Sequence, residues 1–428
     1  MASNKLINVH LFGKEIGRIG LNEETLSSSF QYKPEYLQES NYLNIFPETG
    51  ILSRIPEVQL FNRFNNKTFR GIPPQFADSL PDLFGSIIFK TWLASKDKHE
   101  ITVLEQLAYV GNRGMGALEY SPIKKIPKTA SINLTEIIEV LKSVLDVKQV
   151  VSQKKLTSKA LINVFKIGSS AGGARPKILI SEHKETGEII PGDIEYSNDY
   201  DHYLIKLAID EVYPREHIEY CYYQVATAVG INMMPSKLIE NKHFATLRFD
   251  RQNGEKQHSL TATGLTGWDF MSIENSSYEN LFKLSNYLKI SHAQIEQLFR
   301  RMIFNVVFRN IDDHLKNHSF MYNSAEDRWN LSPAYDITYR LNPLIDFKKE
   351  QRALSINGKR SDIKLKDVLI VAEKFTIKNP RGIVKEVLAG IELLGNEMNA
   401  LGIPKHVSNQ IMVIVNNVRK AFGAKSQL

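Results

Sequence analysis

The residues best suited to chemistry lie in a polar stretch at 309–317 (RNIDDHLKN) and in the SPAYDI sequence that follows it. Asp312 and Asn317 are five residues apart, and Asp336 comes nineteen residues after Asn317. Phosphoryl transfer to a hydroxyl needs a carboxylate that orients the nucleophile and oxygen ligands that hold magnesium on ATP. These three side chains supply such groups, so their spacing predicts phosphoryl-transfer chemistry.

Protein kinases place an Asp and an Asn five residues apart in the catalytic loop, with another Asp shortly after. The chain lacks HRD, DFG and APE strings, so by motif it is not an ordinary protein kinase. The same chemistry also needs a phosphate-binding loop, a cation for the ATP phosphates and rigid elements that hold them. These parts must therefore come from other segments of the chain.

A glycine-rich stretch at 168–177 (GSSAGGARPK) connects two strand-like segments, KALINVFKI and KILISEH. Its three glycines and two serines would give a phosphate access to backbone N–H groups. It does not match the Walker A pattern, because Lys177 is neither preceded by glycine nor followed by Ser or Thr. A flexible hairpin loop fits the same residues equally well.

The segments after this stretch follow the order of a kinase N-terminal lobe. Lys206 lies in an apolar strand at 202–208, where it is either an edge lysine or the cation for ATP phosphates. The helix at 216–229 is closed by Gly230 and carries Glu219, which either pairs with Lys206 or faces solvent. The strand HFATLRFDR at 243–251 would form the hinge beneath the adenine.

A strongly amphipathic helix at 291–308 leads directly into the polar stretch. Ser291 and Gln294 predict a capping box, and apolar residues then recur at i, i+3 and i+4. Helical patterns continue to the C-terminus. This part of the chain is therefore expected to be all-helical, with the candidate catalytic loop fixed by the buried helix.

The N-terminal part alternates apolar and polar residues and is expected to be rich in β-structure. Residues 5–21 predict a hairpin around Gly13, and residues 101–111 predict a short helix. In the DSLPD segment, Asp78, Ser79 and Asp82 are catalytic candidates, although Ser79 as a helix N-cap is the simpler interpretation. The loop GNRGMG at 111–116 does not match a phosphate cradle. An amphipathic helix is expected at 131–148.

Composition limits the function classes. The 428 residues are 43% hydrophobic and 24% charged, which is ordinary for a globular protein of two or three domains. A net charge of +7 without a run of like charges is weak support for a nucleic-acid surface. The single cysteine, Cys221, excludes an intramolecular disulfide and is expected to be a buried thiol. No signal peptide or membrane span is expected, so we predict a cytoplasmic protein.

The ordered set of glycine-rich loop, strand lysine, helix, hinge, catalytic loop and late aspartate resembles the HipA family of serine/threonine kinase toxins. The resemblance covers nearly the whole chain and implies an α+β, two-lobed, protein-kinase-like fold. It implies an N-terminal subdomain at 1–122, a kinase N-lobe at 123–255 and an all-helical C-lobe at 256–428.

The resemblance also assigns roles to residues. Asp312 is the expected catalytic base, Asn317 and Asp336 the Mg²⁺ ligands, and Ser170 (or Ser169) the autophosphorylated serine of the mobile loop. The expected ATP-binding residues are Gly172, Gly173, Ala174, Arg175, Pro176, Lys177, Lys206, Leu247, Arg248, Phe249, His314, Leu315, Lys316, Asn317, Tyr335 and Asp336. Two positions depart from the best-known members: GGARPK replaces a GAQEK form, and Leu247 stands where those members have Glu.

The resemblance further implies ATP and Mg²⁺ as cofactors and a HipB-like helix-turn-helix antitoxin as partner, with DNA contacted indirectly through that complex. The family precedent is phosphorylation of a serine in glutamyl-tRNA synthetase, which inhibits translation and growth. A small-molecule kinase of similar architecture and an inactive DNA-associated partner are the alternatives. The intact Asp312, Asn317 and Asp336 argue against the inactive form.

Overall fold

The N-terminal part forms a five-stranded antiparallel sheet. The computed structural model describes residues 6–39, 43–47, 51–81, 101–123, 138, 177–192, 197–209, 213–340 and 351–423. In the order β4-β3-β2-β1-β5, the strands are Gln59–Phe61, Ser27–Tyr32, Lys14–Asn22, Leu6–Leu11 and Leu118–Ser121. Gly13 has a φ of 75° at the turn between β1 and β2, which confirms the predicted hairpin. The short helices α1 (Pro34–Leu37), α2 (Pro74–Ala77) and α4 (Val103–Val110) accompany this sheet.

A second antiparallel sheet follows, with strand order β7-β6-β8-β10-β9. Its strands are β6 (Lys177–His183), β7 (Ile189–Pro191), β8 (Tyr200–Lys206), β9 (Ser236–Ile239) and β10 (His243–Leu247). The register pairs Lys206 with both Lys177 and Phe244, so β8 holds its last residue in the middle of the sheet. Helix α7 (Arg215–Ala228) packs beside β9 and β10. The predicted strand lysine and the predicted helix after it are both present.

The C-terminal part is mostly helical but also contains strands, so the expectation of an all-helical lobe was wrong in this detail. Strands β13 (Ser259–Thr261), β14 (Ser319–Asn323) and β15 (Arg328–Leu331) form a small antiparallel sheet. The short hairpin β11 (Arg251–Gln252) and β12 (Glu255–Lys256) precedes it. Buried and exposed side chains alternate in RWNL, a period of two that four residues are too few to reveal in the sequence.

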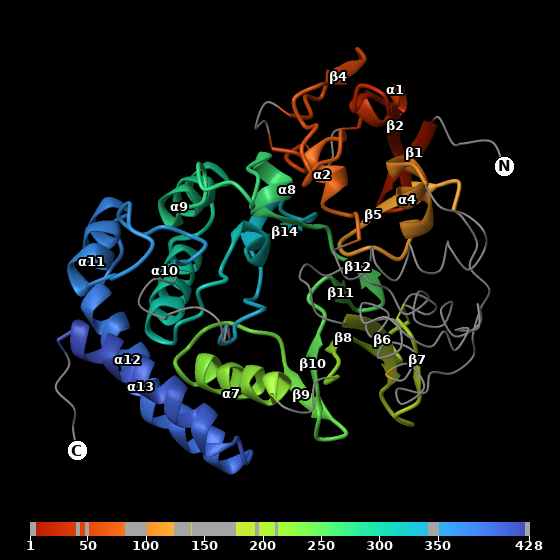
Figure 1. The fold of residues 1–428 in the computed structure, drawn as a ribbon. Coiled ribbons are helices and arrows are strands. Elements are labelled where there is room, and N and C mark those ends of the chain that lie inside the picture. Colours follow the sequence, from red (N-terminus) through yellow and green to blue (C-terminus); the bar gives the residue numbers. More distant parts are fainter. Residues whose placement is uncertain are drawn as a thin grey trace.

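The helices of this part are α8 (Ala262–Thr266), α9 (Tyr278–Tyr287), α10 (His292–Val307), α11 (Leu365–Lys374), α12 (Pro380–Ala400) and α13 (Lys405–Ala421). Figure 1 shows α9 to α13 on one side of the molecule and the two five-stranded sheets on the other. Helix α12 contacts α7, α10 and α13. A Cβ at Gly390 would lie 2.7 Å from Val229 Cγ1, so this glycine permits the close approach of α12 to the end of α7.

Helix α10 begins where the sequence predicted, but without the predicted capping box. Ser291 is the N-cap residue and its side chain makes no capping hydrogen bond. The amide of Gln294 instead contacts the small sheet: its Nε2 donates to Asn330 Oδ1 at 3.0 Å, and its Oε1 accepts from Leu331 N at 3.0 Å. These tertiary hydrogen bonds engage the Gln294 side chain, which a capping box would have paired with the backbone N–H of Ser291.

Several other expectations can be compared with the structure. Cys221 is buried, and burial raises the pKa of its thiol to about 12, as befits an inert core thiol. Asp82 and the glycine-rich stretch before Lys177 fall outside the described residues, as does the helix expected at 131–148 except for residue 138. Among the helices that the structure describes, none is long and apolar enough to span a bilayer.

Candidate active site

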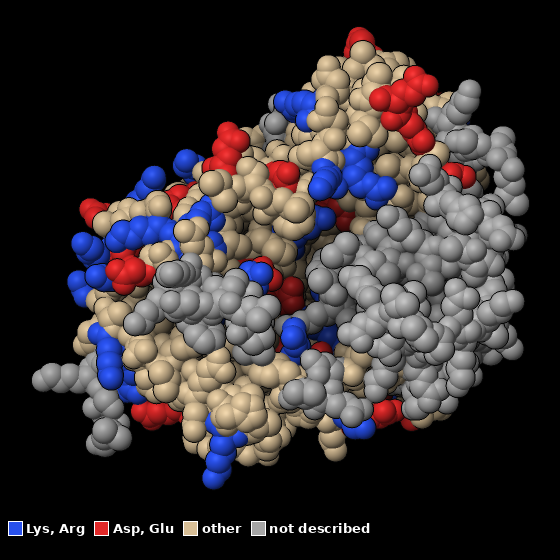
Figure 2. Space-filling model, viewed as in Figure 1, with Lys and Arg blue, Asp and Glu red and all other residues tan. Residues whose placement is uncertain are grey.

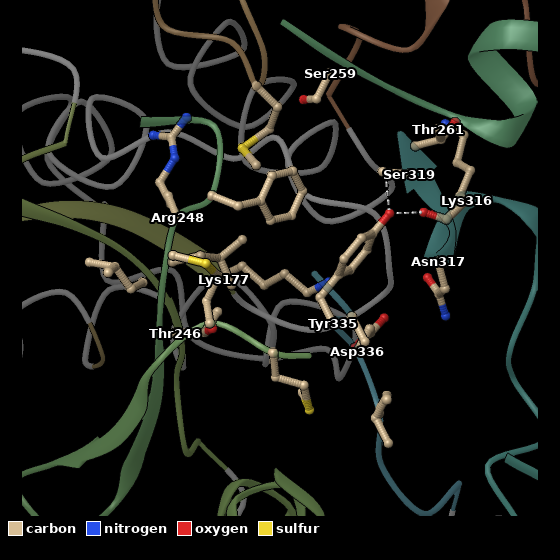
Figure 3. A pocket seen from close by; sticks show the side chains of 18 of the residues that line it. Lys177, Thr246, Arg248, Ser259, Thr261, Lys316, Asn317, Ser319, Tyr335 and Asp336 are labelled. Carbon is tan, nitrogen blue, oxygen red and sulfur yellow. Dashed lines mark hydrogen bonds between the residues drawn. The ribbon is translucent and has the colours of Figure 1, made fainter. Parts of the chain in front are cut away.

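A cavity of about 140 Å³ lies where the second sheet faces the helical part of the chain. It brings together nine of the residues predicted to bind ATP: Lys177, Lys206, Leu247, Arg248, Phe249, Lys316, Asn317, Tyr335 and Asp336. Figure 3 shows Arg248 and Thr246 on one side of this cavity and Lys316 and Asn317 on the other, with Tyr335 and Asp336 between them. In the space-filling view, charged side chains of both signs lie in a hollow near the middle of the molecule (Figure 2).

Lys206 joins the two halves of the site. Its Nζ forms ion pairs with Glu219 Oε1 on α7 and with Asp336 Oδ1 in the segment after the small sheet. Lys206 and Glu219 have side chains only 5% and 2% exposed, so the edge-lysine interpretation is excluded. Removing Lys206 would leave the buried Glu219 carboxylate without its cation, so the pair fixes the position of α7 relative to β8. Asp336 has a φ of 55°, a left-handed conformation that turns its backbone at the cavity.

The candidate catalytic loop is organised around the backbone of Asp312. Its carbonyl oxygen accepts hydrogen bonds from His314 N at 2.8 Å and from Asn317 Nδ2 at 2.9 Å. The Asp312 side chain is 54% exposed, and its Oδ1 lies 3.5 Å from Arg340 Nη1. Asp312 does not itself line the cavity, but Asn317, which holds its carbonyl, does. The loop therefore presents a carboxylate to solvent beside the cavity.

The next aspartate faces the opposite way. Asp313 is almost fully buried, and its Oδ2 accepts from Arg352 Nη2 at 2.6 Å and from Tyr278 Oη at 2.7 Å. Burial raises the pKa of the Asp313 carboxyl, although Arg352 works in the opposite direction. Ala353 N also donates to Ile311 O at 2.8 Å. This network fixes the loop from behind, and the sequence analysis missed it.

Two predicted residues of the loop lie away from the cavity wall. Leu315 is fully buried in the core, and the ring of His314 packs on Phe270 with centroids 5.0 Å apart. Burial lowers the pKa of His314 despite the nearby Asp312 and Asp336 carboxylates, which raise it. Lys316 lines the cavity, with its Nζ 5.3 Å from the Phe270 ring.

Aromatic side chains form the wall between the hinge and the loop. The rings of Phe249 and Tyr335 are 5.8 Å apart, and Tyr335 Oη donates to Lys316 O at 2.7 Å. Burial raises the pKa of Tyr335 above its ordinary value, so its hydroxyl stays protonated and can donate. Aromatic lining of this kind, beside the strand predicted to be the hinge, is common in small-molecule and cofactor sites.

A buried charge cluster fixes the hinge to the N-terminal part. Asp250 binds Arg248 through two hydrogen bonds of 2.9 and 2.8 Å, and also accepts from Arg251 and from Gly116 N. Burial favours a higher pKa for Asp250, but the two arginines outweigh it and hold the pKa below its usual value. The loop containing Gly116 is thereby held against the hinge. The alternating charges in RFDR are the sequence signal for this cluster, which the sequence analysis did not predict.

The N-terminal part also contributes directly to the cavity wall, through residues that include Asp78, Ser79 and Met115. The Asp78 carboxylate accepts from Thr261 N and Oγ1, both at 2.8 Å, and the Ser79 hydroxyl accepts from Tyr120 Oη at 2.8 Å. The Asp78 contact joins the N-terminal part to the segment before α8, whereas the Ser79 contact lies within the N-terminal part. Neither geometry indicates a catalytic role.

The donor chemistry suits magnesium more than a soft metal. Among the described residues there is no group of three His, Cys, Asp or Glu that could hold a metal by itself. Asn317 and Asp336 offer oxygen ligands, and Mg²⁺ is commonly held by one or two protein oxygens together with nucleotide phosphates and water. Asn317 Nδ2 is used by Asp312 O, which leaves its Oδ1 for a cation. Gly172, Gly173, Ala174, Arg175, Pro176, Ser169 and Ser170 fall outside the described residues, and their roles stay predictions.

Comparisons with known proteins agree with this architecture. The chain is similar in fold to HipA of Shewanella oneidensis MR-1, solved in a toxin–antitoxin complex with HipB and operator DNA. That match has a TM-score of 0.61 at 14% identity and covers 97% of this chain and 99% of that one. The likeness confirms the two-lobed, kinase-like α+β fold. The proinflammatory kinase CtkA of Helicobacter pylori matches at a TM-score of 0.39 and 13% identity, over 59% of this chain and 90% of that one. That match is too weak to support an argument.

Family models give the assignment. A search of curated proteins finds no significant match. The model of the HipA N-terminal domain matches residues 7–121, and the model of the HipA-like C-terminal domain matches residues 169–393. The second match alone spans more than half of the 428 residues. The chain therefore belongs to the HipA family.

Proposed function

We propose that this chain is a serine/threonine protein kinase that transfers the γ-phosphate of ATP to a serine of a protein. The observation that carries the proposal is the double ion pair of Lys206 with Glu219 and Asp336 at a cavity that Asn317 also lines. Kinases need this combination of strand lysine, helix glutamate and metal-binding aspartate in place together. Family membership supports the same activity.

The proposed mechanism assigns one task to each side chain. Lys206 neutralises the nucleotide phosphates, and Asn317 and Asp336 would hold Mg²⁺, which when bound would offset the charge of the transferring phosphoryl group. Asp312 accepts a hydrogen bond from the substrate hydroxyl and aligns it for in-line attack. Because the transition state is loose, most of the rate comes from positioning and charge neutralisation. The exposure of Asp312 leaves its carboxylate accessible to a protein hydroxyl.

Family membership and the complex reported for the Shewanella protein support a toxin role for this chain. The proposed partner is a HipB-like helix-turn-helix antitoxin, with DNA contacted through it. The proposed target is an aminoacyl-tRNA synthetase, whose phosphorylation would inhibit translation.

The glycine-rich stretch is proposed to act as a self-limiting switch. A phosphate on Ser170, or on the adjacent Ser169, would add a charge of about −1.5 to −2 to a segment that must accept ATP phosphates. Like-charge repulsion would then empty the site. Intact-mass spectra after incubation with Mg-ATP test this proposal: Ser170→Ala should gain one phosphate fewer than wild type. An unchanged phosphate count for both Ser170→Ala and Ser169→Ala would refute it.

Labelled ATP, magnesium and a cell lysate test the main proposal. The wild-type chain should label protein, and Lys206→Met should lower the rate by at least about 100-fold, because the phosphates lose their cation. Lys237→Met is the matched control, since Lys237 is another sheet lysine paired with a glutamate, Glu182, but does not line the cavity. A labelled small product would point to a small-molecule kinase, and no labelled product would favour an inactive partner.

A further inference from the structure

The segment after Asp336 carries a second cation to the candidate active site. Residues 337–340 alternate, with Ile337 and Tyr339 buried and Thr338 and Arg340 more exposed. This alternation places Ile337 and Tyr339 on the buried face of the segment and Thr338 and Arg340 on its outer face. The buried pair anchors the segment, and Arg340 extends from it to the carboxylate of Asp312, with 3.5 Å between Nη1 and Oδ1.

This contact involves the carboxylate of Asp312, whereas the hydrogen bonds within the loop hold only its backbone carbonyl. The backbone carbonyl of Asp312 is held by His314 N and Asn317 Nδ2. Among the residues that the structure describes, Arg340 is the side chain that pairs with its carboxylate. A carboxylate on solvent can rotate, and a rotated carboxylate does not align a hydroxyl.

We infer that Arg340 is a positioning residue, which holds Oδ1 of Asp312 so that Oδ2 faces the substrate hydroxyl. The inference rests on the proposed function and adds a residue to it. In the step concerned, the substrate oxygen bonds to the γ-phosphorus while the bond from that phosphorus to the β–γ bridging oxygen breaks. ADP leaves, and Asp312 accepts the hydroxyl proton. Arg340 remains a cation throughout and exchanges no proton.

The length of the contact fits this role. At 3.5 Å the pair is looser than the 2.6 Å contact of Arg352 with Asp313, and both of its partners are about half exposed. Catalytic contacts are often long in free enzymes and shorten when substrate closes the site. An exposed pair of this length adds little to stability, so its removal should leave the fold intact.

Kinetics of Arg340 variants test the inference, with initial rates of label transfer to protein measured over a series of Mg-ATP concentrations. Arg340→Ala should lower the maximal rate about 10- to 100-fold and leave KM for ATP within about twofold. Arg340→Lys should recover part of the rate, because an ammonium can still pair with the carboxylate. Added guanidinium should partly restore Arg340→Ala. Arg328→Ala is the matched control, since Arg328 on β15 pairs with Glu326, both side chains are about half exposed, and neither lines the cavity.

A double variant shows whether Arg340 acts through Asp312. In the Asp312→Asn background, at higher enzyme concentration, Arg340→Ala should change the residual rate less than about twofold. The inference is overturned by an unchanged rate in Arg340→Ala, by a raised KM for ATP with the maximal rate intact, or by a full effect in the double variant. The raised KM would show a phosphate contact. A wild-type chain that transfers no phosphate overturns the proposed function as well.

Discussion

Asp312 and Asp313 are neighbours in the chain, yet the two faces of the loop give them opposite environments. Asp312 is 54% exposed and meets Arg340 at 3.5 Å, whereas Asp313 is 1% exposed and meets Arg352 at 2.6 Å. On the solvent face, the contacts leave a carboxylate accessible to a substrate. On the buried face, they fix the backbone that carries it. The comparison teaches that accessibility and rigidity are supplied separately, by adjacent residues of one type.

Activity should separate the two aspartates most strongly. Asp312→Asn removes the proposed acceptor for the hydroxyl and should lower phosphate transfer about 100- to 10,000-fold. The free energy of unfolding should change by less than about 1 kcal/mol, because the lost pair is exposed. Initial rates with labelled ATP and urea unfolding measure the two effects. An Asp312→Asn protein with wild-type transfer rates would refute the assignment of the base.

Stability should respond mainly to Asp313. Asp313→Asn leaves the Arg352 guanidinium, which is 4% exposed, without its carboxylate, and should lower the free energy of unfolding by about 3–5 kcal/mol. Asp362→Asn is the matched control: its side chain is 75% exposed and 3.3 Å from Lys364, so less than about 1 kcal/mol is expected. Urea denaturation distinguishes the two variants. Equal losses would mean that burial does not separate them.

Sequence spacing could predict the residues on the solvent face of the site, but not the buried network that fixes the loop from behind. Asp312, Asn317 and Asp336 stand out because the chemistry fixes their types and spacing. For Glu219 the sequence left two interpretations, pairing with Lys206 or facing solvent, and the observed ion pair supports the first. Arg352 lies 39 residues from Asp313, and no periodicity links the two residues.

Local rules failed where tertiary contacts replaced them. Gln294 fits a capping box by spacing, but its side chain bonds to Asn330 and Leu331. The strands of the small sheet are three to five residues long, which is too short for a reliable period-two pattern. The catalytic and ATP-binding roles stay predictions until they are tested by experiment.

The buried face should also make stability depend on pH. His318 lies on this face, with its ring 5.7 Å from that of Tyr278, and burial lowers its pKa to about 3. The unfolded chain takes up a proton near pH 6.5 and the folded chain does not. The contribution of His318 to the free energy of unfolding is therefore fully present above about pH 6.5 and falls by about 1.4 kcal/mol per pH unit below it.

Unfolding free energies at pH 7 and pH 5 check this dependence. His318→Gln should remove about 2 kcal/mol of the difference between them, since glutamine binds no proton. His406→Gln, at an exposed position on α13, is the control and should leave the pH dependence unchanged. A His318→Gln protein with the wild-type pH dependence would show that His318 is not held neutral.

The smallest expected effect is the coupling energy of the solvent-face pair, and it tests the division of the loop most directly. A double-mutant cycle on unfolding, with Asp312→Asn and Arg340→Ala, should give less than about 1 kcal/mol, because solvent screens both charges. The same cycle with Asp313→Asn and Arg352→Ala should give several times more, since both charges are buried. A free-energy coupling of Asp312 with Arg340 as large as that of Asp313 with Arg352 would show that both faces stabilise the fold. The contact between Asp312 and Arg340 would then contribute to the free energy of unfolding, and only the kinetic experiments would support Arg340 as a positioning residue.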